Sequence, residues 1–338
     1  MSQDTDTLSL DDARALLRAA FERTGVPTDR ANSVAKALVA AEAEGQVGHG
    51  FSRLEDYAAQ VRSGKIIADA DISIERPAPA SIVIDAGFGF AFPALDLAID
   101  LGTSAAQTQG TASVGIKNSH HCGALSVSVD RIAQKGLVAI MVANSPVAIA
   151  PWGAKTPVYG TNPIAFATPR SDGPPLVIDL SLSVVARGKV LNAKKAGADI
   201  PEGWALDTEG KPTTNAEAAL KGSMQPIGGP KGTALALMVE ILSTVMTGAN
   251  FSKDAGSFFT ADGSRPGVGQ HLTLYRPPQE LDLFTARLEE LLSLIDALEG
   301  TRLPGARRLE ALEKARKNGI SVPRRYLDVA NRLAGRFA

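Results

Sequence analysis

Histidine is scarce in this chain, and three of its four histidines stand close to glycines. His49 lies in Gly48-His49-Gly50, and the other two lie in the run Asn118-Ser119-His120-His121-Cys122-Gly123. Histidine has an unperturbed pKa of about 6.5, so it can give or take a proton near neutral pH. For any one of these residues, a place in a core or a turn is the simpler interpretation. Taken together, the three histidines are explained equally well by proton-transfer chemistry and by a structural role.

Arg53 and Tyr57 follow His49 at helical spacing. If a helix begins at Ser52, both side chains lie on one face of its first turns. A guanidinium group offers two parallel donors to a carboxylate, and His49 would be close enough to handle a proton. The pattern indicates a carboxylate-binding site, and the alternative is a solvated arginine near a helix start.

Lys231 lies in the run Gly228-Gly229-Pro230-Lys231-Gly232, directly before an apolar stretch. Glycines, free backbone amides and a lysine at a helix N-terminus suit phosphate oxygens. A plain helix-entry turn explains the same residues equally well.

Other kinds of site are disfavoured by residue spacing. The run Gly87-Phe88-Gly89 lacks the third glycine of a Rossmann fingerprint, and no P-loop motif is present. The side chains of His120, His121 and Cys122 are adjacent and cannot readily converge on one ion, so no metal site is expected. Cys122 is better interpreted as a small buried hydrophobic residue than as a nucleophile.

The composition is that of a globular protein large enough for two domains. The chain has 338 residues, and a domain commonly has about 100–200. A formal net charge of −1 predicts no attraction to nucleic acid or anionic lipid. A single cysteine is typical of a reducing compartment, and no apolar run reaches the roughly 18–20 residues that span a bilayer. The first eight residues are polar and unlike a secretory signal, so we expect a cytoplasmic protein.

Hydrophobic periodicity predicts helices and short strands in alternation. Helices are expected from Ser9 to about residue 25, with Ser9 as N-cap, from Thr28 to Glu44, and from Ser52. Strands are expected over 81–85, 111–116, 137–143 and 175–180, with helices over 92–107 and 124–134 and a short one within 211–220. A buried apolar helix is predicted over 231–246, an amphipathic one over 281–298 and a basic helical tail from Arg302. Residues 250–280, rich in Gly, Pro and polar side chains, receive no element.

Several segments together resemble the type-2 malate/L-lactate dehydrogenases, and their motifs are closest to the 3-sulfolactate dehydrogenase-like branch. The matching pieces are residues 48–53, 118–121, 150–153, 160–166, 179–189, 229–232 and 302–305. They occur in the expected order along nearly the whole chain.

The resemblance implies an α/β (α+β) protein without a conventional Rossmann fold. Residues 1–75 would form a helical domain on the substrate side, joined by C-terminal helices of residues 283–338. Residues 76–282 would form a central mixed-sheet domain that binds NAD(P)H, with NADP favoured. The family is usually homodimeric, and its substrates are small carboxylates.

The resemblance also implies residue roles. His49 matches the proton donor and acceptor. His121 matches either a second proton acceptor or a cofactor contact. Arg53 and Thr161 match substrate contacts, with Tyr57 beside Arg53. Cofactor contacts are implied for His121, Cys122, Gly123, Ala124, Ser145, Asp179, Leu180, Ser181, Lys231, Arg302, Leu303, Pro304, Gly305, Arg307 and Arg308.

Two positions depart from one branch of this family. Relatives that reduce cyclic imino acids carry a serine and an aspartate as a relay, where this chain has Gly48 and Lys189. The expected activity is therefore the interconversion of a small 2-hydroxy acid and its 2-oxo acid. A cyclic ketimine reductase is the alternative, and a ligand-binding relative without turnover is the third.

Overall fold

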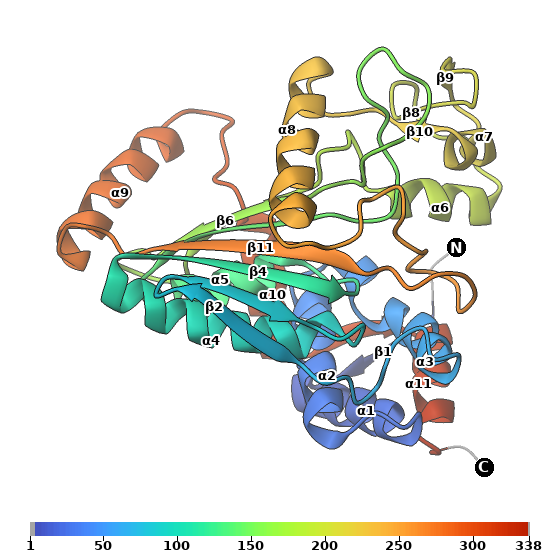
Figure 1. Ribbon diagram of the computed structural model, residues 1–338, viewed down its shortest axis with the longest axis horizontal. Coiled ribbons are helices and arrows are strands. Elements are labelled where there is room, and N and C mark those ends of the chain that lie inside the picture. The colour runs from blue at the N-terminus through green and yellow to red at the C-terminus, as the bar shows by residue number, and fades with distance from the viewer. Residues whose placement is uncertain (1–3, 337–338) are drawn as a thin grey trace.

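The protein is a mixed α/β structure built around one seven-stranded sheet, as the computed structural model in Figure 1 shows. The structure describes residues 4–336. The sheet contains β2 (Ser73–Ala78), β3 (Ser81–Asp85), β4 (Thr111–Ser119), β11 (Val268–Tyr275), β5 (Val138–Ala143), β6 (Ile164–Thr168) and β7 (Leu176–Leu180), in that spatial order. Only β3 and β4 run parallel, and every other neighbouring pair is antiparallel. The predicted mixed α/β fold is confirmed.

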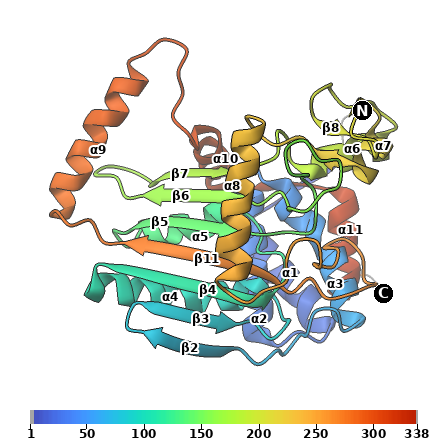
Figure 2. The same ribbon diagram turned by 45° about the horizontal axis from the view of Figure 1, so that its top comes forward.

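Two helices cover one face of this sheet, α4 (Ala91–Gln109) and α5 (Leu125–Ala133). Figure 2 shows both behind the strands. Alternate residues of the strands, such as Val114, Met141 and Leu272, point into this core and are fully buried. Strand β4 carries the sequence towards His120 and His121, so this core fixes where the histidine run begins.

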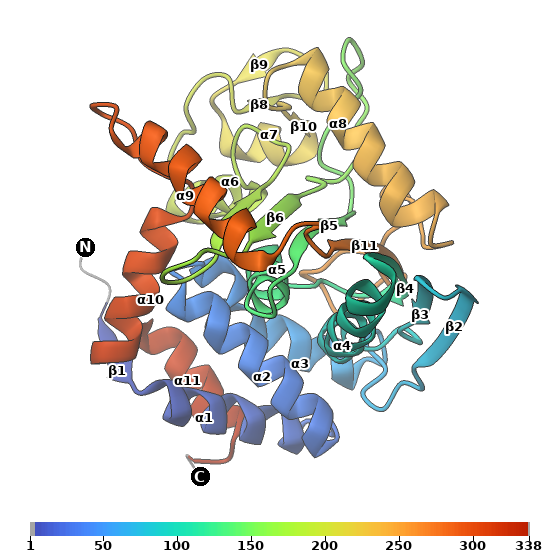
Figure 3. The ribbon, with the colours of Figure 1, turned by 90° about the vertical axis from the view of Figure 1, so that its left-hand side faces the viewer.

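Helices from both ends of the chain pack together into a second layer (Figure 3). It is built from α1 (Leu10–Arg23), α2 (Thr28–Ala43), α3 (Leu54–Arg62), α10 (Ala306–Asn318) and α11 (Arg324–Leu333). A two-stranded sheet of β1 (Thr5–Leu8) and β12 (Ile320–Pro323) ties the N-terminal and C-terminal segments together. The predicted N-cap is confirmed, since the Ser9 hydroxyl accepts a hydrogen bond from the Asp12 amide.

A third group of buried side chains lies on the other side of the sheet. Its side chains come from α6 (Arg187–Ala196), α7 (Ala216–Lys221), α8 (Pro230–Glu240) and the short strands β8 (Ala205–Leu206) and β10 (Ser223–Met224), among others, and β9 (Pro212–Thr213) pairs with β8. Helix α9 (Leu281–Asp296) lies at the far end of the sheet from the terminal helices (Figures 1 and 2). The division into two domains at residues 75 and 282 stays a prediction.

Three local predictions need correction. The helix expected to be buried over 231–246 is α8 followed by a π-helical turn (Ile241–Val245), and several of its apolar side chains are exposed. The segment without an expected element contains β11, which is central in the sheet. The third helix begins at Leu54 rather than Ser52, after short 3₁₀ turns at Val47–His49 and Phe51–Arg53. For β11 the reason is its pairing with β4 and β5, which are distant in sequence and override the local pattern.

Candidate active site

The two predicted catalytic histidines stack on each other. The ring centroids of His49 and His121 are 5.1 Å apart and the rings are inclined by 11°. His49 ends the first 3₁₀ turn after α2, and His121 follows the end of β4. The structure therefore brings together two residues from separate layers of the fold, as a shared active site requires.

Close packing against Glu42 explains why the second residue after Gly48 in the Gly-His-Gly run is also a glycine, Gly50. A Cβ atom at Gly50 would lie 1.9 Å from a carboxylate oxygen of Glu42, so only glycine fits there. That carboxylate accepts a 2.8 Å hydrogen bond from the Phe51 amide, and burial raises its pKa to about 7. Gly48, in contrast, has open space around its Cβ position. The close approach to Glu42 fixes the turn that presents His49.

Each histidine of the second run has a different environment. His120 is buried, and its Nε2 lies 2.8 Å from the Gln60 side-chain oxygen. His121 Nδ1 lies 2.5 Å from the Tyr57 hydroxyl. Burial raises the pKa of Tyr57, so its hydroxyl stays protonated and can donate a hydrogen bond to Nδ1. This hydrogen bond leaves His121 Nε2 as the nitrogen that carries a proton.

Both histidines of the stack are neutral at physiological pH. Burial, and then the positive charge of Arg53, lower the pKa of His49 to about 3. The same two causes, in the same order, hold the pKa of His121 well below its usual value. A neutral imidazole next to a guanidinium group is ready to accept a proton from an acid held by that group.

Arg53 is held in place but keeps donors free. Its Nε donates a 2.7 Å hydrogen bond to the Gly48 carbonyl, and its guanidinium carbon lies 4.7 Å from the ring centroid of Phe259. Its Nη1 atom is buried without a hydrogen-bond partner among residues 4–336. A buried donor of a charged group without an acceptor is costly, about 1–3 kcal/mol or more. A bound carboxylate would supply that acceptor.

Thr161 and Ser145 lie side by side at the ends of neighbouring strands. The Thr161 amide donates a 3.0 Å hydrogen bond to the Ser145 hydroxyl oxygen, and the two hydroxyl oxygens are 3.3 Å apart. Asn162, at a positive φ of 40°, anchors this turn through a 2.9 Å hydrogen bond to the buried Glu240 carboxylate. The arrangement gives both hydroxyl groups fixed positions.

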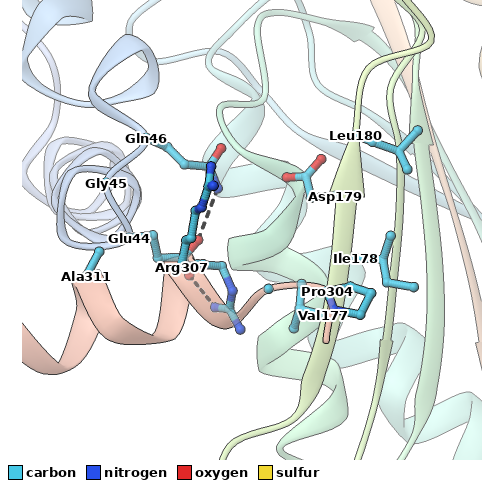
Figure 4. A pocket seen from close by; sticks show the side chains of 12 residues that line it. Glu44, Gly45, Gln46, Val177, Ile178, Asp179, Leu180, Pro304, Arg307 and Ala311 are labelled. Atoms are coloured by element: carbon cyan, nitrogen blue, oxygen red, sulfur yellow. Dashed lines mark hydrogen bonds and ion pairs between the residues drawn. The ribbon is translucent and has the colours of Figure 1, made fainter. Parts of the chain in front are cut away.

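Six of the predicted cofactor residues line one cavity of about 550 Å³. It lies between the end of α2, the strand β7 and the start of α10, as Figure 4 shows. From the predicted set it is lined by Asp179, Leu180, Pro304, Gly305, Arg307 and Arg308. Segments that are distant in the sequence thus form a single site.

The walls of this cavity carry opposite charges. Asp179 accepts a 2.8 Å hydrogen bond from the Ser126 amide, and burial raises its pKa to about 6. Across the cavity, Arg308 is buried and bonds Glu44 at 2.8 Å and Asp130 at 3.4 Å. Arg307 is exposed, and no ion pair involves it within the described chain. One arginine of the loop therefore braces the structure while its neighbour stays available to a ligand.

Comparison with known proteins identifies the family. The malate/L-lactate dehydrogenase family matches residues 8–329. The chain belongs to the malate/L-lactate dehydrogenase family. Members of this family are oxidoreductases, so the chain is an enzyme.

Two kinds of named relatives are similar to this chain. It is 48% identical over 321 residues to "(2R)-3-sulfolactate dehydrogenase (NADP(+))" of Chromohalobacter salexigens, which covers 95% of this chain and 96% of that protein. It is 37% identical over 324 residues to a Delta(1)-pyrroline-2-carboxylate/Delta(1)-piperideine-2-carboxylate reductase of Pseudomonas putida, covering 95% of each. The crystal structure of Δ1-piperideine-2-carboxylate reductase from Pseudomonas syringae superposes with a TM-score of 0.92 at 35% identity, covering 97% of this chain and 100% of that one.

The remaining predicted residues of the dehydrogenase have these positions. Cys122, Gly123 and Ala124 are buried directly after His121, and Ser181 donates a hydrogen bond to the Ser183 carbonyl at 3.3 Å. Lys231 is exposed at the first turn of α8, and Arg302 and Leu303 precede the cavity loop. Their cofactor roles, like the substrate roles of Arg53, Tyr57 and Thr161, stay predictions.

Sequence reasoning missed Phe258, Phe259 and Gln60. The ring centroid of Phe258 lies 5.1 Å from that of His121 and 5.4 Å from that of His120. Both phenylalanines come from the segment without an expected element. Gln60 stands three residues after Tyr57 in a helix, so helical spacing alone would have placed it on the same face.

Two kinds of feature are absent from residues 4–336. No helix within residues 4–336 is long and apolar enough to cross a membrane. The same residues contain no group of three or more His, Cys, Asp or Glu side chains that could hold a metal ion. The cytoplasmic location stays a prediction.

Proposed function

We propose that the protein is an NADP-dependent dehydrogenase that interconverts a small 2-hydroxy acid and its 2-oxo acid. The observation that carries this proposal is the neutral imidazole of His49 beside Arg53, whose Nη1 is buried without an acceptor. A 2-hydroxy acid has a carboxylate for the arginine and an adjacent hydroxyl group for the histidine. The 48% identity to an enzyme named for NADP(+) and sulfolactate supports both the cofactor and the substrate class.

The residues of the 550 Å³ cavity fit a phosphorylated dinucleotide. Helix α10 has 13 residues, and its N-cap residue is Gly305, which has no side chain to cap the first amides. Its free amides, together with the exposed Arg307, suit phosphate oxygens. A Cβ atom at Gly305 would lie 2.7 Å from the Val177 carbonyl oxygen, so glycine keeps the loop close to β7. The Asp179 carboxylate offers an acceptor to ribose hydroxyl or amide groups.

The protein groups have complementary roles in the reaction. When bound, NADPH supplies the hydride. Arg53 holds the substrate carboxylate and so orients the carbonyl group. His49 gives a proton to the developing alkoxide in the reductive direction and removes it in the oxidative direction. A carboxylate on Arg53 offsets the charge that lowers the pKa of His49, so substrate binding favours uptake of the proton that reduction requires.

The missing partner of His49 Nδ1 favours the hydroxy acid over the cyclic imine. His49 Nδ1 is buried without a hydrogen-bond partner in the described part of the chain, and Gly48 has no side chain that could provide one. Lys189 is exposed at the start of α6. The serine–aspartate relay of the imine-reducing relatives therefore has no counterpart around this imidazole. A cyclic ketimine reductase remains the second candidate because relatives at 37% identity carry that name.

Oxidation of NADPH and NADH with four substrates tests this proposal. Oxaloacetate, pyruvate, sulfopyruvate and piperideine-2-carboxylate are compared at equal concentration by loss of absorbance of the reduced cofactor. We expect turnover with an open-chain 2-oxo acid and a preference for NADPH. Turnover with the cyclic imine alone would replace the hydroxy acid assignment by the second candidate.

We also propose that the protein is a homodimer, with the face around α8 as its interface. Ile140 and Phe166 are cross-strand neighbours, and both lie only partly buried on the sheet face opposite to α4 and α5. The apolar residues that α8 and its π-helical extension leave exposed are Leu235, Leu237, Met238, Ile241, Val245 and Met246. An apolar helix face beside a half-covered sheet face is typical of a surface that a second copy buries.

Light scattering coupled to size exclusion tests the dimer. We expect wild-type protein to have twice the mass of one chain and Ile241→Lys to run as a single chain at micromolar concentration, because a buried unpaired charge is strongly unfavourable. Ile74→Lys is the matched control, since Ile74 on β2 has the same 43% exposure as Ile241. A wild-type monomer, or a dimer that survives Ile241→Lys, would contradict this interface.

A further inference from the structure

Residues 257–265 precede β11 and lie against the C-terminal end of α3 (Figures 1 and 2). We call them the roof segment. It brings Phe258 against His120 and His121, and Phe259 against the Arg53 guanidinium group at 4.7 Å. Phe258 is buried although it belongs to an irregular segment. The two aromatic rings of the roof segment therefore contact both the histidines and the arginine of the predicted site.

The roof segment is fastened by side chains that bind its backbone carbonyl groups. Gln60 Nε2 donates to the Phe258 carbonyl at 2.9 Å, and the Ser63 hydroxyl donates to the Ala261 carbonyl at 3.0 Å. Lys65 Nζ donates to the carbonyl groups of Thr260 at 3.0 Å and Asp262 at 2.8 Å. An irregular segment has no ladder of its own, so these donors take the place of secondary structure.

Two of these donors have little alternative to the roof segment. Gln60 is fully buried, and its side-chain oxygen is 2.8 Å from His120 Nε2, so one amide group bridges the histidine and Phe258. The Lys65 residue is only 4% exposed. A lysine with so little exposed surface needs acceptors for its ammonium group, and the two carbonyl groups are those acceptors. The roof segment therefore depends on Lys65 for its position, and the Lys65 ammonium group depends on the carbonyl groups of the roof segment for its acceptors.

We propose that Lys65 is a positioning residue and that the roof segment is the specificity element of the substrate site. Lys65 holds the segment so that Phe258 closes the space beside His121 and Phe259 supports Arg53. An aromatic ring at this place leaves room for a small substituent on the third carbon of the substrate and excludes a branched or aromatic one. The proposal rests on the dehydrogenase function above and assigns its size selectivity to residues outside the reacting groups.

The steady-state test compares one small and one bulky 2-oxo acid. For wild type, Phe258→Ala and Lys65→Met, kcat/KM is measured with the preferred small substrate and with 4-methyl-2-oxopentanoate. We expect the bulky-to-small ratio of kcat/KM to rise at least tenfold in both variants, while NADPH affinity stays within twofold. Lys253→Met is the control, because this exposed lysine of the same connection pairs only with Asp254, and its ratio should not change.

Hydrogen–deuterium exchange separates this proposal from the dehydrogenase assignment. Lys65→Met should increase exchange of the amides of residues 258–265 while those of the central strands stay protected, whatever reaction the protein catalyses. Ser63→Ala, which removes one anchor near the surface, should give a smaller change in the same direction and serves if Lys65→Met does not fold. Unchanged exchange in both variants overturns the positioning role. An unchanged bulky-to-small ratio of kcat/KM in Phe258→Ala overturns the specificity role. If no 2-oxo acid is turned over but Lys65→Met still increases amide exchange in the roof segment, only the proposed function is rejected.

Discussion

His49→Gln is expected to lower kcat by about 10²- to 10⁴-fold, the usual contribution of a positioned acid or base. Glutamine keeps a polar group of similar reach but cannot carry the proton. NADPH affinity, measured by fluorescence titration, should stay nearly intact because His49 does not line the cofactor cavity. His271→Gln is the matched control, since this buried histidine bonds Ser113 on the sheet and its pKa is also lowered by burial.

The pH dependence of kcat/KM should differ between the oxidative and the reductive direction, because His49 acts as a base in the first and as an acid in the second. With a pKa of about 3 in the free enzyme, His49 is already a base between pH 5 and 8. The oxidative kcat/KM should therefore have no acid limb from this residue in that range. The reductive kcat/KM needs the protonated form, so it should fall by up to tenfold for each pH unit. An active His49→Gln enzyme with an unchanged reductive slope would remove His49 from the mechanism.

Arg53→Met is expected to raise the KM for the 2-oxo acid and to lower kcat/KM by roughly 10- to 150-fold. This range corresponds to the loss of about 1.5–3 kcal/mol, the contribution of a hydrogen bond to a charged group. Methionine retains the apolar contact with Phe259 and removes every donor. Because Arg53 is the second cause of the low pKa of His49, the reductive pH profile should also shift towards higher pH.

Two further variants make this prediction specific. Arg53→Lys should recover only part of the loss, because an ammonium group cannot form the paired hydrogen bonds of a guanidinium group. Arg62→Met removes an exposed arginine from the last turn of α3, the helix that Arg53 precedes, and should behave as wild type. If Arg53→Met binds the 2-oxo acid as tightly as wild type, the carboxylate is held by another group.

The sequence predicted what depends on neighbouring residues. The start of α1 after Ser9 was predictable because capping is local, and α2 does begin at Thr28, although no side chain caps it. The cavity residues came from resemblance, and the structure gathers several of them without testing their roles. The bond between Arg308 and Glu44 joins residues 264 positions apart, and no local pattern contains that information. The same holds for Phe258, whose burial depends on side chains of α3.

The position of β11 also has a consequence for how the chain folds. Strands β4 and β5 are close in sequence, yet β11 separates them in the sheet and pairs with both. The sheet cannot close until residue 275 is available, and the β1–β12 pair waits for residue 323. Pairings between such distant segments slow folding and prolong the exposure of unpaired strand edges. During synthesis, the strands of the first half of this protein therefore depend on β11 for their pairing. A fragment that ends before β11 leaves one edge of β4 and one edge of β5 without the partner that β11 provides in the native sheet.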